Sequence, residues 1–94
     1  MNLQNIMAQA KKIQSDVQKI NKDIENTSFE GNNGLVHITM KGNRQVIKVV
    51  LDSVEDKELL EDMILLAVND AVSKIEKIRD EKLGKYTNGM GGLL

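Results

Sequence analysis

The sequence predicts an α+β fold: a long N-terminal helix, a three-stranded antiparallel β-meander and a long C-terminal helix. Three observations predict it. Apolar residues recur every three or four positions from Leu3 to Ile24, as they do on one face of a helix. In the middle of the chain the apolar period falls to two, between turns rich in glycine and asparagine. The helical period then returns from Leu60 to Ile78.

The first predicted helix spans residues 2–25. Its apolar positions are separated alternately by three and four residues, and they are Leu3, Ile6, Ala10, Ile13, Val17, Ile20 and Ile24. This spacing is a heptad seam, which is typical of helix–helix packing. The same stripe also suits an amphipathic helix lying on a sheet. Both kinds of packing therefore remain open for this helix.

The middle segment predicts three strands. Residues 27–30 are β-prone, and the cluster Gly31-Asn32-Asn33-Gly34 predicts a turn. Residues 35–41 alternate, which places Val36, Ile38 and Met40 on one face. Gly42-Asn43 predicts a tight hairpin, because both residue types accept a positive φ. A further strand over 45–51 is expected to direct Ile47, Val49 and Leu51 to the core.

The second predicted helix begins near Ser53, where Ser53 and Asp56 resemble a capping box. It is expected to end near Leu83, since Gly84 can terminate it. Residues 1–86 then form a single domain, and residues 87–94 a disordered tail. Two long amphipathic helices carry more apolar surface than one face of a small sheet can cover. This surplus predicts a homodimer.

Composition argues against an enzyme. The chain has no cysteine and one histidine, so thiolate and multi-histidine metal sites within one chain are excluded. No phosphate-binding glycine loop is present, and His37 has no nucleophile motif beside it. The acidic run over 52–62 could attract a hard cation, but negative charge at a helix start is the favoured interpretation. We expect no catalytic residue, metal, cofactor or small-molecule substrate.

The sequence is also not expected to carry a secretory signal or a membrane span. The first residues lack the basic and apolar regions of a secretory signal. The longest apolar run covers residues 63–68, which is far shorter than a membrane span. The expected location is the cytoplasm, with no membrane partner.

The positions of the charged residues are more informative than the net charge. The chain has 13 Lys and Arg residues and 14 Asp and Glu residues, for a net charge of −1. On the first helix, however, four lysines fall within an arc of about 100° opposite the apolar seam. These residues, called the lysine stripe below, are Lys11, Lys12, Lys19 and Lys22. The second helix instead mixes signs, with Asp70–Lys74 and Glu81–Lys85 spaced as ordinary surface pairs. A stripe of one sign suits contact with the phosphates of duplex DNA, but lysines on an ordinary solvated helix face are also common, so the stripe alone leaves both interpretations open.

Several motifs are similar to those of one bacterial protein family. They are Asn5-Ile6-Met7-Ala8-Gln9-Ala10 at the start, Gly34-Leu35-Val36 before a strand, Gly42 at the hairpin, and Leu60-Glu61-Asp62-Met63-Ile64 followed by Ala67-Val68-Asn69-Asp70-Ala71. In their order and spacing they resemble the YbaB/EbfC family, over nearly the whole chain.

The resemblance implies a tweezer-like homodimer that associates with the nucleoid and binds double-stranded DNA with little sequence specificity. It also implies DNA contacts from the terminal helices, which we assign to Lys11, Lys12, Lys19 and Lys22. Arg44 and Lys48 near the hairpin are added as further candidates. The alternative function is a protein–protein interaction module that grips a partner with its apolar helices. Asn69 and Asp70 could make a polar contact across an interface or lie on plain exposed surface.

Overall fold

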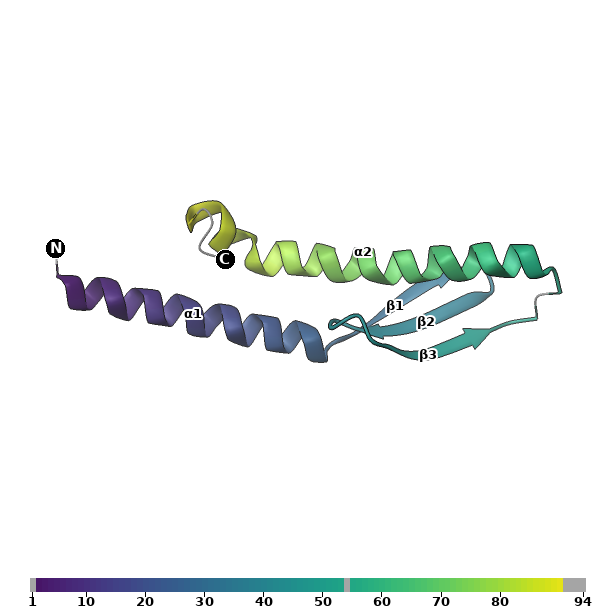
Figure 1. The fold of residues 1–94 in the computed structure, drawn as a ribbon, viewed down its shortest axis with the longest axis horizontal. Helices are drawn as coiled ribbons and strands as arrows, with labels where there is room; N and C mark the ends of the chain where they lie inside the picture. Colours follow the sequence, from purple (N-terminus) through teal and green to yellow (C-terminus); the bar gives the residue numbers. More distant parts are fainter. Residues whose placement is uncertain (1, 54, 91–94) are drawn as a thin grey trace.

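The computed structural model describes residues 2–53 and 55–90, and it confirms the predicted order of elements (Figure 1). Helix α1 spans Leu3–Asn26 and helix α2 spans Lys57–Met90. Between them lie strands β1, Ser28–Asn33, β2, Val36–Lys41, and β3, Val46–Leu51. The strands form one antiparallel sheet in the order β1-β2-β3. The chain is strongly elongated, with extents of 68 × 20 × 13 Å.

The core lies between α2 and the first two strands. Val36, Ile38 and Met40 are buried, which confirms the predicted inner face of β2. They pack with Phe29 of β1 and with the small and branched residues of the α2 stripe, Ala67, Ala71 and Ile75. The alanines let the helix axis approach the sheet closely, so that a thin two-layer core is filled.

β1 is longer than predicted, and the expected turn over residues 31–34 is wrong. The strand continues to Asn33, and the turn is reduced to Gly34 and Leu35. Gly31 is in the strand because α2 lies directly on it: a Cβ there would lie 2.0 Å from the carbonyl oxygen of Ala67. The glycine and asparagine content of residues 31–34 suggested a turn, whereas Gly31 is needed for the close packing of α2 on β1. Gly34 does adopt a left-handed φ of 57°.

The β2–β3 hairpin also differs from its prediction. The positive φ falls on Arg44, at 68°, and not on Gly42 or Asn43. Gly42 is required for space, because a Cβ there would lie 1.9 Å from the carbonyl oxygen of Ile24 at the end of α1. The side chain of Asn43 accepts a hydrogen bond from the backbone N–H of Gln45 at 2.9 Å, which stabilises the turn.

β3 does not face the core as predicted, since every residue of this strand is exposed. α2 packs on β1 and β2 but not on β3. A bulge shifts the pairing, so that Lys48 lies opposite Thr39 and Val46 opposite Met40, and Ile47 becomes the extra residue. Val49 and Leu51 remain on the core side, opposite Ile38 and Val36, but beyond the reach of the helix.

The limits of α2 were predicted inaccurately at both ends. The helix begins at Lys57, and the capping side chain is Asp56 in place of Ser53: its Oδ1 accepts the backbone N–H of Leu59 at 3.2 Å. Gly84 lies inside the helix, which continues to Met90. Residues 91–94 of the expected tail lie outside the described residues.

α1 combines the two kinds of packing that its seam left open. Its C-terminal half contacts both α2 and β2, and burial increases along the seam, from 68% exposure at Leu3 to 2% at Ile24. Its first turns project past the described end of α2 (Figure 1). The helix is therefore anchored at its C-terminal end and extends from the body as an arm.

Candidate nucleic-acid interface

The lysine stripe lies on the exposed side of the α1 arm. All four side chains are exposed, whereas the seam residues Ile13, Val17 and Ile20 are half-buried. None of the four ammonium groups makes an ion pair with any residue that the structure describes. With a rise of about 1.5 Å per residue, Lys11 and Lys22 are about 17 Å apart along the axis, or about five phosphate spacings of one DNA strand.

Arg44 and Lys48 are outside this stripe. The hairpin carrying Arg44 is joined to the end of α1, because the N–H of Gly42 donates to the carbonyl of Thr27 at 3.0 Å. Arg44 is thus at the same end of α1 as Lys22, and its Nη2 is 3.8 Å from Oε1 of Glu76. Lys48 instead extends from β3 on the sheet face away from α2.

That outer face of the sheet holds a shallow hollow of about 240 Å³, lined by Glu30, Asn32, His37, Ile38, Thr39, Lys48 and Val50. Nδ1 of His37 is 2.8 Å from Oδ1 of Asn32, and Nε2 is 3.5 Å from Oδ2 of Asp52. The imidazole thus has two polar neighbours at the surface. Lys48 belongs to this polar face and not to the arm.

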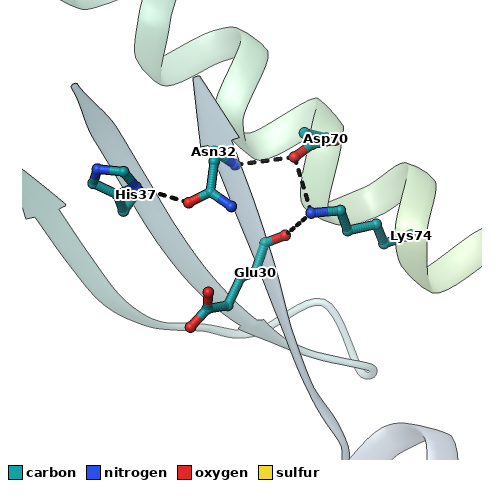
Figure 2. A network of polar contacts seen from close by, with 5 residues as sticks. All are labelled: Glu30, Asn32, His37, Asp70 and Lys74. Atoms are coloured by element: carbon teal, nitrogen blue, oxygen red, sulfur yellow. Dashed lines mark hydrogen bonds and ion pairs between the residues drawn. The ribbon is translucent and has the colours of Figure 1, made fainter. Parts of the chain in front are cut away.

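Figure 2 shows a polar network that the sequence did not predict. Oδ2 of Asp70 accepts the backbone N–H of Asn32 at 3.0 Å. Nζ of Lys74 donates to the backbone carbonyl of Glu30 at 2.6 Å and lies 3.3 Å from Oδ2 of Asp70. Asp70 and Lys74, named the edge clamp, therefore hold α2 to the backbone of β1. The pKa of Asp70 is lowered from its ordinary value of 3.8, mainly by the hydrogen bond from the backbone N–H of Asn32 and secondly by the ammonium group of Lys74.

The Asp70–Lys74 pair itself was predicted from its spacing, and the structure confirms it. The hydrogen bonds from this pair to the backbone of β1 could not be predicted from the sequence. The one sign of them is that Asp70 interrupts an apolar stripe. Neither earlier interpretation of Asp70 is complete, because its carboxylate binds the chain's own sheet. The prediction of the other pair is wrong: Glu81 and Lys85, both described by the structure, form no ion pair with each other, and Nζ of Lys85 lies 5.0 Å from the ring centre of Tyr86.

A second missed contact joins the two helices. Nη1 of Arg79 on α2 donates to Oδ1 of Asn21 on α1 at 2.6 Å, in a partly buried position. Asn21 is beside the seam, one residue before Lys22. This contact therefore fixes α1 against α2 near the base of the arm, and with it the direction of the lysine stripe.

Two further features concern residues 2–53 and 55–90, the part of the chain that the structure describes. In this part of the chain no three acidic or histidine side chains are grouped closely enough to hold a metal ion. No helix there is both long and apolar enough to cross a membrane.

Comparison with known proteins gives consistent matches. The profile of the YbaB/EbfC DNA-binding family matches residues 1–90. Nucleoid-associated protein LL0120 of Lactococcus lactis is 43% identical, with 96% of this chain and 97% of that protein covered. A nucleoid-associated protein of Corynebacterium glutamicum is 40% identical, with 98% and 95% covered.

Among solved structures, the uncharacterized protein HP0035 of Helicobacter pylori has the same fold. Its TM-score is 0.73 at 18% identity, and the match covers 97% of this chain and 99% of that one. At this identity the likeness concerns the fold alone.

Proposed function

This chain belongs to the YbaB/EbfC DNA-binding family, and we propose that it is a nucleoid-associated homodimer that binds duplex DNA through the phosphate backbone. Binding is of low sequence specificity, takes place at the bacterial nucleoid in the cytoplasm, and contributes to nucleoid organisation and gene regulation. The proposal includes no catalytic step. The names of the relatives in L. lactis and C. glutamicum support the location.

The observation that carries the proposal is the lysine stripe. Four exposed ammonium groups without ion pairs follow one side of a projecting helix. Phosphate contacts position a protein on DNA but do not read its sequence. The stripe consists of lysines, whose ammonium groups act on phosphates as point charges, so contact through it would be tolerant of sequence.

A net charge of −1 is compatible with this function because the charges are segregated. The acidic run around Asp52, Asp56 and Asp62 lies at the start of α2, at the opposite end of the molecule from the arm (Figure 1). At physiological ionic strength the Debye length is about 8 Å, which is much shorter than the 68 Å length of the chain. The acidic run would therefore be screened from phosphates beside the arm, where the four lysines outnumber the three acidic residues of α1, Asp16, Asp23 and Glu25.

Homodimerisation is supported by the surface of β3. Its five apolar side chains are between 39% and 52% exposed, and they are Val46, Ile47, Val49, Val50 and Leu51. An exposed apolar edge strand promotes aggregation unless another molecule covers it. A second copy supplies a matching apolar surface through a two-fold axis, because such an interface joins the same patch on both chains. Two such chains would project two α1 arms, each with its lysine stripe, in a tweezer-like arrangement.

The test is a gel shift with random-sequence duplex DNA across a salt series. If about four to six of the eight stripe lysines in a dimer neutralise phosphates, the slope of log affinity against log salt is about −4 to −5. A slope near zero, or binding that depends on one particular sequence, would contradict backbone binding.

The apolar surface of β3 also favours a second candidate function, a protein–protein interaction module. In that case the same gel shift would show no complex even at the lowest salt concentration. The protein would remain monomeric in isolation, because β3 would be reserved for another protein.

A further inference from the structure

The two edges of the sheet differ in what covers their backbone. β1 and β3 are the edge strands. At β1, side chains of α2 bind one backbone N–H, that of Asn32, and one carbonyl, that of Glu30. At β3, no side chain that the structure describes binds the backbone. One edge is therefore occupied from within the chain, and the other is open.

We propose that the edge clamp, Asp70 and Lys74, closes the β1 edge to strands of other molecules, so that assembly through the sheet takes place at β3 alone. A strand that adds to an edge needs the outward N–H and C=O groups of alternate residues. Glu30 and Asn32 are two such alternate residues, and the clamp already binds one group on each. An incoming strand would have to displace two hydrogen bonds, one of them from an ammonium group.

Closing the β1 edge matters because it determines how many copies of the chain can assemble through the sheet. If both edges were open, β3 of one copy could pair with β1 of the next in a head-to-tail contact. Such head-to-tail contacts generate filaments of increasing length unless the rotation between copies closes a ring. When β1 is closed, only contacts that involve β3 on both copies remain, and a two-fold contact of this kind ends at a dimer. The clamp would thus limit the size of the assembly while contributing nothing to the interface itself.

The chain offers a direct test by light scattering after size exclusion. In the variant Asp70→Ala with Lys74→Met, the methionine keeps the covering stem of the lysine but not its donor. We expect its mass to rise with concentration to at least about twice that of the unaltered protein. The matched control, Glu81→Ala with Lys85→Met, removes the same two charges from the same helix away from β1 and should keep the unaltered mass.

A rescue variant separates strand addition from general damage. Adding Asn32→Pro to the double variant removes the backbone N–H that Asp70 had bound, and an edge strand tolerates proline when its N–H does not pair with a neighbour. The mass of this triple variant should return to that of the unaltered protein. If the double variant is folded by circular dichroism but keeps the unaltered mass, or if the triple variant assembles as far as the double variant, the closure proposal is overturned.

Should the double variant lose its helical signal, Lys74→Met alone frees the Glu30 carbonyl and leaves Asp70 on Asn32. An increase in mass supports the proposal, and an unchanged mass overturns it. The mass of the unaltered protein tests the homodimer separately. A monomeric unaltered protein would contradict the homodimer, whereas the change in mass between protein and variant concerns only the clamp.

Discussion

Gly31 shows how one residue without a side chain determines the position of an entire helix. The carbonyl oxygen of Ala67 occupies the space that a Cβ would need, at a distance of 2.0 Å. Because the obstacle is backbone, a larger residue can be accommodated only if α2 moves away from β1. Such overpacking costs about 1–3 kcal/mol, and sometimes more.

Gly31→Ala should therefore lower the free energy of unfolding by about 1–3 kcal/mol. Denaturant titration followed by circular dichroism would measure it. Ser28→Ala, on an exposed side chain of the same strand, should change it by less than about 0.5 kcal/mol. Equal stability of the Gly31 variant and the unaltered protein would show that α2 does not rest on this glycine.

The lysine stripe makes its prediction at the same scale. Lys12→Glu with Lys19→Glu should nearly abolish the gel shift, because two attractive contacts become repulsive in each arm. Both positions are exposed, so folding and dimer formation should be unaffected. The control is Lys77→Glu with Lys82→Glu, the same charge change at exposed positions of α2. If the control is more damaging, α2 carries the DNA contact and the assignment to α1 is wrong.

The lowered pKa of Asp70 predicts how stability depends on pH. When the pKa of a carboxyl group is lower in the folded state than in the unfolded state, the ionised group stabilises the fold at pH values above the unfolded-state pKa. This contribution is lost as the pH falls through the folded pKa, because a protonated carboxyl no longer carries the charge that the N–H of Asn32 and the ammonium group of Lys74 stabilise. Comparing Asp70→Asn with the unaltered protein by thermal melting, we expect a difference at pH 7 that shrinks once the pH falls below the ordinary value of 3.8. A difference independent of pH would show that the charge of Asp70 is irrelevant to the clamp.

At the scale of elements, the helices and their apolar faces could be predicted because helical periodicity is local. The covered face of β2 followed equally from alternation. The environment of β3 could not be predicted in this way: alternating valines and isoleucines look the same whether a helix of the same chain or another molecule covers them. An α-helix with side chains is about 10 Å wide, and strands are about 4.8 Å apart. One helix therefore covers about two of three strands, and α2 covers β1 and β2.

The candidate site likewise has a part that could be predicted from the sequence and a part that could not. The lysine stripe could be predicted because it belongs to one helix, where sequence spacing gives the angle directly. The edge clamp and the Asn21–Arg79 contact could not, because each joins side chains to partners far away in the sequence. A backbone group such as the carbonyl of Glu30 can accept a hydrogen bond whatever the side chain of its residue is, so the sequence does not reveal this contact.

The Asn21–Arg79 contact predicts that DNA affinity depends on the direction of the arm as well as on its charge. Asn21→Ala removes the acceptor without changing any charge. A hydrogen bond contributing about 1 kcal/mol to the positioning of α1 corresponds to about a fivefold loss of affinity. The gel shift would measure it, with an unchanged salt slope because the same lysines remain. Affinity equal to that of the unaltered protein would show that other contacts set the direction of the arm.

At the scale of the whole molecule, the thin and elongated shape connects assembly with DNA binding. A chain only 13 Å across in its smallest dimension leaves one strand of its sheet uncovered, and the same strand is the proposed dimer contact. The DNA contact is on an arm that projects away from that strand (Figure 1). Dimerisation would therefore double the number of lysine stripes without covering them.

This separation predicts that affinity and salt dependence change together when the dimer is broken. Val49→Asp with Leu51→Asp places two charges on exposed positions of β3, so each chain should stay folded, and light scattering should show a monomer. With one arm in place of two, the slope of log affinity against log salt should fall to about half, since each phosphate neutralised contributes about −0.9. Ser28→Asp with Gln45→Asp adds the same charge at exposed positions outside β3 and should keep both the dimer and most of the slope. A monomer that retained the full slope would mean that a single arm makes all the phosphate contacts, and the tweezer-like arrangement would then have no role in DNA binding.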